Sequence, residues 1–151
     1  MLKNLVRALV AIWYLLGWVL HIYLGLFNPG AYQAFGTTAL IPGFDRVWAG
    51  LIMPRVAVLA LLLAVFEIAV GFLLLYRGRW VTLGLIVSIL FNGFLVQLGL
   101  GFPAPDSGSD FYFNRLPNLV FVLVQIYLLL QSYPQPFWVW ARELQVSEQA
   151  K

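Results

Sequence analysis

Residues 55–76 have the sequence RVAVLALLLAVFEIAVGFLLLY, an apolar run interrupted by one acid, Glu67, near its middle. A helix of about twenty such residues matches the hydrocarbon thickness of a bilayer, so the run predicts a transmembrane helix. A carboxylate at that depth is costly unless it faces protein or water. Ala60, Ala64 and Gly71 share the helical face of Glu67, and small residues let a second helix approach closely. We therefore expect Glu67 to point into a helix bundle.

The composition of the whole chain indicates an integral membrane protein. Of its 151 residues, 62% are hydrophobic and only 10% are charged, which is too little charge to cover a soluble domain. The chain has no cysteine, so it cannot by itself form disulfides, iron–sulfur clusters or thiolate metal sites. Its single histidine also excludes an internal bis-histidine haem.

Three further apolar runs complete a predicted all-α bundle of four membrane-spanning helices in a single domain, residues 1–151. Each run is long enough to cross the hydrocarbon layer, where a helix satisfies its own backbone hydrogen bonds. The tail, residues 134–151, begins with prolines and continues with aromatic residues, which is typical of a segment at the membrane interface. The predicted spans lie at about residues 5–27, 55–76, 80–101 and 117–133.

The two longer connections differ in character. Residues 28–54 are rich in glycine, proline and aromatic side chains, and we expect them to form a structured extracytoplasmic loop over the mouth of the bundle. Within this loop Asp45 is expected to be the N-cap of a short helix. That helix is either an interfacial helix or an early start of span two, and Pro54 is expected to kink or end it. Residues 102–116 predict a polar loop with its two aspartates in solvent.

The basic residues predict the orientation of the bundle. Because cytoplasmic loops of membrane proteins carry an excess of lysine and arginine, their distribution places both termini in the cytoplasm, most simply across the plasma or inner membrane of a prokaryote. Arg77 and Arg79 are expected to set this topology and to contact anionic lipid headgroups. The basic residues flank apolar runs and form no patch for nucleic acid. Those at the predicted cytoplasmic end are Lys3, Arg7, Arg77, Arg79, Arg142 and Lys151, against Arg46, Arg55 and Arg115 opposite.

A layer of polar side chains is expected inside the bundle. Helical periodicity places His21, Asn92 and Gln125 on inward stripes that also carry small or polar residues, and Gln97 lies one turn from the end of its span. Together with Glu67 these residues are candidates for binding a ligand or handling protons. One histidine with one acid is too small a set for a metal site, and no catalytic residue is expected.

Each candidate also has a structural interpretation. Glu67 can be neutral, hydrogen-bonded to Asn92 or another inward polar group, and serve only to lock helix packing, or it can contact another subunit. His21 can be satisfied by a neighbouring helix near the interface. Carboxamides in spanning helices more often join helices than take part in chemistry.

The pattern resembles the DoxX-like membrane proteins. The resemblance rests on four spans, on Gly17 and His21 in the first span, and on Glu67-x-x-x-Gly71 followed by an arginine-containing turn. It covers about residues 5–133. It implies a small four-helix protein of a kind often associated with redox systems, including a subunit type of thiosulfate:quinone oxidoreductase.

The chain departs from that family at three places. His21 stands where a lysine or another polar residue is common, Gln97 stands where a histidine is common late in span three, and the glycines of the fourth span are missing. These departures concern the chemistry more than the fold.

Three functions are compatible with these observations. The leading hypothesis is an accessory subunit of a respiratory or photosynthetic electron-transfer complex, without an intrinsic cofactor or catalysis of its own, packed against other membrane subunits. The alternative is a quinone-binding subunit of an oxidoreductase that uses the polar layer. A small carrier or channel is disfavoured, because no inverted repeat is visible.

Overall fold

The computed structural model describes residues 1–149, and over that range the chain is helical with no strand. Four helical runs in these residues are long and apolar enough to cross a membrane. The predicted all-α class is thus confirmed and is consistent with a multi-pass membrane protein. The orientation stays a prediction, and Lys151 lies outside the described residues. The runs are α1 (Leu2–Phe27), residues Phe44–Leu75, α5 (Arg79–Leu98) and residues Ser107–Leu129.

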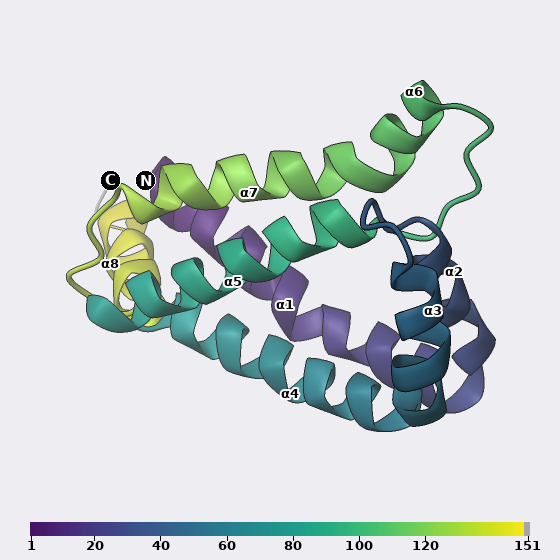
Figure 1. Cartoon of the computed structure of the whole chain (residues 1–151). Coiled ribbons are helices and arrows are strands. Elements are labelled where there is room, and N and C mark those ends of the chain that lie inside the picture. Colours follow the sequence, from purple (N-terminus) through teal and green to yellow (C-terminus); the bar gives the residue numbers. More distant parts are fainter. Residues whose placement is uncertain (150–151) are drawn as a thin grey trace.

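The helices lie in the order α1, α4 (Val56–Leu75), α5, α7 (Leu116–Leu129), each packed on the next. The first and last of these meet where α1 begins and then diverge, as Figure 1 shows. We call the end with the start of α1 and α8 (Phe137–Gln149) the terminal end, and the opposite end the loop end. The bundle is therefore a wedge that opens toward the loop end.

Small residues allow the close approach of α1 and α4. A methyl group added at Gly25 would overlap Cβ of Ala60, and one added at Gly71 would lie 2.5 Å from Cγ of Leu15. Ala60 and Ala64 are buried on the same face as Glu67. The predicted small-residue face of the second span is confirmed.

Two prolines lie inside helical runs rather than at their ends. Wide π-helical turns, η2 (Trp48–Ile52) and η4 (Phe111–Arg115), each finish two residues before a proline, Pro54 or Pro117. Because proline has no N–H and crowds the preceding turn, a wider turn lets the helix continue past it. The run Phe44–Leu75 bends sharply between α3 and α4 (Figure 1). The prediction of an early start of span two is confirmed, while the prediction that residues 102–116 form a loop throughout is wrong.

Several predicted boundaries also need correction. Asp45 is not a cap, because α3 begins after Gly43, which has a φ of 78°, and no side chain caps it. Span three ends at Leu98, since Gly99 takes a φ of 83°, and span four ends at Leu129 rather than at residue 133. The shorter elements are η1 (Pro29–Tyr32), α2 (Gln33–Thr37), α3 (Phe44–Val47), η3 (Met53–Arg55) and α6 (Ser107–Asp110).

The contact between Gly25 and Ala60 can be tested by exchanging the two residues. We expect Gly25→Ala to destabilise the bundle by about 1–3 kcal/mol, because the added methyl forces α1 and α4 apart. The double variant Gly25→Ala/Ala60→Gly should recover most of that loss. Thermal unfolding in detergent, followed by circular dichroism, measures both.

Gly93→Ala is the matched control, since a methyl there meets no atom within 4 Å. It should leave stability unchanged or raise it by up to about 1 kcal/mol through helix propensity. Equal destabilisation by the Gly25 and Gly93 variants would contradict the close packing of α1 on α4.

Candidate functional site

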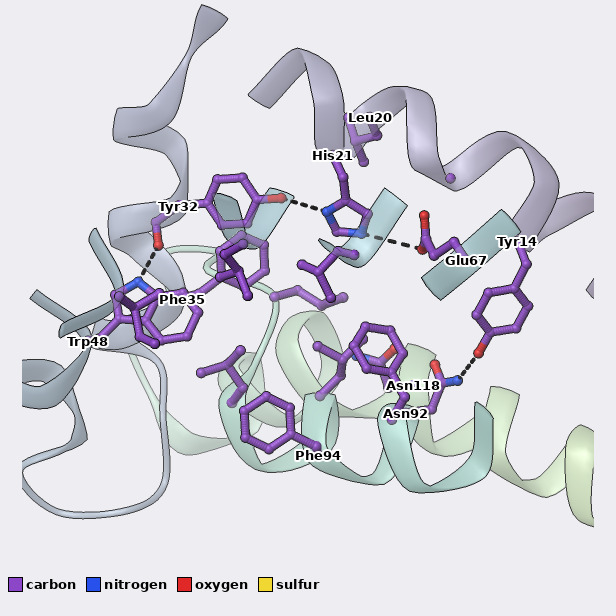
Figure 2. A pocket seen from close by; sticks show the side chains of 18 of the residues that line it. Tyr14, Leu20, His21, Tyr32, Phe35, Trp48, Glu67, Asn92, Phe94 and Asn118 are labelled. Atoms are coloured by element: carbon purple, nitrogen blue, oxygen red, sulfur yellow. Dashed lines mark hydrogen bonds and ion pairs between the residues drawn. The ribbon is translucent and has the colours of Figure 1, made fainter. Parts of the chain in front are cut away.

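A cavity of about 320 Å³ occupies the open side of the wedge. It lies between the spanning helices and residues 28–55, which connect α1 to α4 and which we call the loop segment. Its wall is mostly aromatic and aliphatic, and a few polar groups converge on it, which is the usual composition of a small-molecule site. Figure 2 shows most of the residues that line the cavity. The polar and aromatic lining residues are Trp13, Tyr14, His21, Tyr32, Phe35, Phe44, Trp48, Glu67, Phe91, Asn92, Phe94 and Asn118.

A chain of three side chains runs along one wall of the cavity. Nε2 of His21 lies 3.3 Å from Oε1 of Glu67, and Nδ1 of His21 lies 2.6 Å from the hydroxyl of Tyr32. The chain joins α4 to α1 and then to η1 (Figure 2). The sequence placed His21 and Glu67 on inward faces, and the structure brings them together.

Glu67 has one carboxylate oxygen without a partner. The residue is 5% exposed, and its Oε2 makes no hydrogen bond. A Cβ at Gly17 would lie 2.9 Å from both carboxylate oxygens. The absence of a side chain at Gly17 therefore leaves room for Glu67 of α4 against the surface of α1. A buried polar atom left unpaired is costly, so Oε2 is a hydrogen-bond acceptor that no group of the described residues uses.

Of the partners expected for Glu67, Asn92 or another inward polar group, it is His21 and not Asn92 that contacts the carboxylate. Asn92 Nδ2 donates instead to the hydroxyl of Tyr14 at 2.6 Å and to the carbonyl of Ser88 at 2.8 Å, and Gln125 Nε2 donates to the same hydroxyl at 3.4 Å. These residues join α1, α5 and α7, as the structural interpretation of the carboxamides expected. Of the two carboxamides, only Asn92 lines the cavity.

The remaining predicted residues lie elsewhere. The side chain of Gln97 is exposed and does not line the cavity. Gln97 lies five residues beyond Asn92, which turns it about 140° around the helix from the inward face. Arg77 and Arg79 are exposed at the turn between α4 and α5, at the terminal end. No group of three His, Asp or Glu side chains that could hold a metal ion occurs within residues 1–149.

Sequence reasoning missed three polar residues of the cavity wall. Tyr14 lies seven residues before His21, and Asn118 seven before Gln125, so the helical repeat that selected His21 and Gln125 also applied to them. Nδ2 of Asn118 is a second buried atom without a partner. Tyr32 had no such signal, because it comes from the loop.

The loop segment is fastened over the cavity by specific contacts. Nε1 of Trp48 donates to the carbonyl of Tyr32 at 2.8 Å, and a Cβ at Gly36 would lie 2.7 Å from the Trp48 ring. Oγ1 of Thr38 donates to the carbonyl of Leu98 at the end of α5, at 3.0 Å. Burial raises the pKa of Tyr32 to about 12, with a smaller contribution from the negative charge of Glu67, so Tyr32 stays a neutral phenol.

Arg115 fastens the same loop to two helices. Its guanidinium donates to the carbonyls of Val96 and Gln97 at 3.0 and 3.1 Å and to the carbonyl of Thr38, so it caps the end of α5. Its Nε lies 3.0 Å from Oδ2 of Asp110. The sequence predicted Asp110 to be solvated, and this is wrong, because the carboxylate is paired with a buried arginine.

Arg7 is buried at the terminal end, although the sequence suggested only a topological role. Its guanidinium lies 4.6 Å from the centre of the Tyr133 ring, and Nη1 donates to the carbonyl of Tyr76 at 3.4 Å. Burial raises the pKa of Tyr133 to about 12, so a neutral ring covers the cation. Arg7 thus holds the start of α1 against the α4–α5 turn and the end of α7.

The fold and the site together define a class of protein: an all-helical chain whose four spanning-length helices border an aromatic cavity containing a carboxylate–imidazole pair. Comparisons with protein-family models, curated proteins and solved structures find no match for this chain. The resemblance to DoxX-like proteins stays a prediction.

The Arg115 contacts can be tested with a conservative substitution. We expect Arg115→Lys to destabilise the protein by about 2–4 kcal/mol, because lysine keeps the charge but cannot reach three carbonyls and a carboxylate together. The apparent Tm in detergent should fall. Arg46→Lys, at an exposed arginine of the same loop segment, should change stability by less than about 0.5 kcal/mol. Similar Tm values for the two variants would show that the Arg115 contacts do not hold the loop.

Proposed function

We propose that this chain is a quinone-binding subunit of a membrane electron-transfer system. The observation that supports it best is the unpaired Oε2 of Glu67, buried beside a cavity walled by aromatic rings. A flat, apolar ring with polar oxygens at its edge suits such a wall, because aromatic faces stack and a few polar groups orient the ligand.

The cavity borders surfaces that lipid would contact. Trp13 and Leu20 of α1 and Phe94 of α5 line it, yet they are 65%, 57% and 45% exposed on the outside of the bundle. A ligand dissolved in the membrane can therefore enter between the diverging helices without crossing water. A lipid-soluble carrier fits this route better than a polar metabolite.

The polar groups of the cavity are suited to proton exchange. Quinone reduction adds protons to the ring oxygens, and a carboxyl group paired with an imidazole at 3.3 Å can give or take a proton at such an oxygen. Nδ2 of Asn118 offers an additional donor for a ring oxygen. In this proposal the electrons come from a partner protein, because a chain with no cysteine and one histidine cannot hold an iron–sulfur cluster or a bis-histidine haem of its own.

We also propose a membrane and a complex to which the chain belongs. We place it with the DoxX-like proteins, as one subunit of a respiratory or photosynthetic assembly in the plasma or inner membrane of a prokaryote. Its terminal end would face the cytoplasm, with Arg77 and Arg79 at the lipid headgroups.

Binding of a short-chain benzoquinol, kept reduced under anaerobic conditions, to the protein in lipid nanodiscs tests this function. Trp13 and Trp48 line the cavity, so a bound ring should change tryptophan fluorescence. We expect Glu67→Gln to weaken binding about tenfold or more, because the quinol O–H loses a charge-assisted hydrogen bond to the carboxylate. We expect His21→Ala, which removes the partner of that carboxylate, to weaken binding as well.

Glu143→Gln makes the same acid-to-amide change at an exposed residue of α8 and should bind the quinol as the wild type does. Circular dichroism should show all the variants folded. Unchanged affinity in both cavity variants would exclude this cavity as the quinone site.

A further inference from the structure

Both ring nitrogens of His21 are already in use. Nε2 faces Oε1 of Glu67, and Nδ1 faces the hydroxyl of Tyr32, with the His21 and Tyr32 rings stacked at 29° and 6.2 Å between centroids. A neutral imidazole has one nitrogen that donates and one that accepts. The two neighbours therefore decide which nitrogen carries the proton.

Tyr32 is placed to donate to this imidazole. It is 3% exposed, it is held by Trp48, and its raised pKa keeps its O–H protonated. A phenol that donates to Nδ1 leaves the ring proton on Nε2, where it points at Oε1 of Glu67. The reverse arrangement would put an N–H against the phenol and leave two acceptors, Nε2 and Oε1, facing each other.

We propose that Tyr32 fixes the tautomer of His21 with the proton on Nε2 and thereby keeps Oε2 of Glu67 as a hydrogen-bond acceptor for a ligand that carries a hydroxyl group. This inference rests on the proposed quinone function and specifies it further. The ligand that suits the resting cavity is the reduced, hydroxyl-bearing quinol, and Tyr32 is a positioning residue that acts through His21.

The preference for the reduced form follows from counting donors and acceptors. Nε2 lies 3.3 Å from Oε1, and the second oxygen of an ionised Glu67 has only lone pairs to offer. A quinol brings an O–H to Oε2 and its second oxygen can accept from Nδ2 of Asn118. An oxidised quinone has only acceptors, so it satisfies Asn118 and leaves Oε2 unpaired.

Nitrogen NMR measures the tautomer directly, because His21 is the only histidine in the chain. Protein labelled with ¹⁵N-histidine should show a protonated Nε2 and an unprotonated Nδ1. Tyr32→Phe keeps the ring but removes the donor, and it should give a mixture of tautomers, while Tyr23→Phe, at an exposed tyrosine of α1, should not. A protonated Nδ1 in the wild type, or an unchanged spectrum in Tyr32→Phe, would overturn the role of Tyr32.

Calorimetry with a short-chain benzoquinone and its quinol under anaerobic conditions tests the ligand preference. We expect the quinol to bind about tenfold tighter or more, and Glu67→Gln to remove that difference. Equal affinities, or tighter binding of the quinone, would overturn this inference while the proposed function stands. Binding of neither form would overturn the ligand assignment together with the proposed function, and the NMR result would still decide the tautomer.

Discussion

The structure depends on the burial of one carboxylate at the contact between α1 and α4. A charge or a polar group in that position is tolerated only when protein groups replace its lost water. Gly17 of α1 leaves the space that the Glu67 side chain occupies. His21, four residues after Gly17 on α1, supplies a partner at 3.3 Å. Only one oxygen is satisfied in this way. The function proposed for the cavity follows from the oxygen that is left over.

Two buried arginines hold the wedge in shape from its two ends. Arg115 joins the loop segment to the end of α5 and to Asp110, and Arg7 joins the start of α1 to Tyr76 and the Tyr133 ring. Arginine suits both places, since its planar group can reach several carbonyls or stack on an aromatic face while it stays charged. With the ends fixed, α1 and α7 can diverge between them without the bundle collapsing onto the cavity.

The prolines explain much of the difference between the expected and the observed boundaries. Glycine, proline and polar turn residues predict loops over residues 28–54 and 102–116, with Pro54 ending or kinking a helix and Pro117 lying in the first turn of the next one. In the structure a wide turn precedes each of Pro54 and Pro117, and the helix continues. Whether a proline ends a helix or is passed by a wide turn depends on the packing around it, so propensity rules could not predict these continuations.

Length and hydropathy alone determined that this is an all-helical chain with four runs able to span a membrane, because a bilayer imposes both constraints on the sequence. Helical periodicity also determined that Glu67, His21 and Asn92 face inward, since neighbours three, four and seven residues away share a face. The tertiary structure decided which groups meet. Tyr32 reaches His21 from a loop whose path depends on contacts with other helices, and Oε2 remains unpaired because no neighbour is positioned to reach it. Such pairings join residues distant in sequence, and only the packing of the helices brings them together.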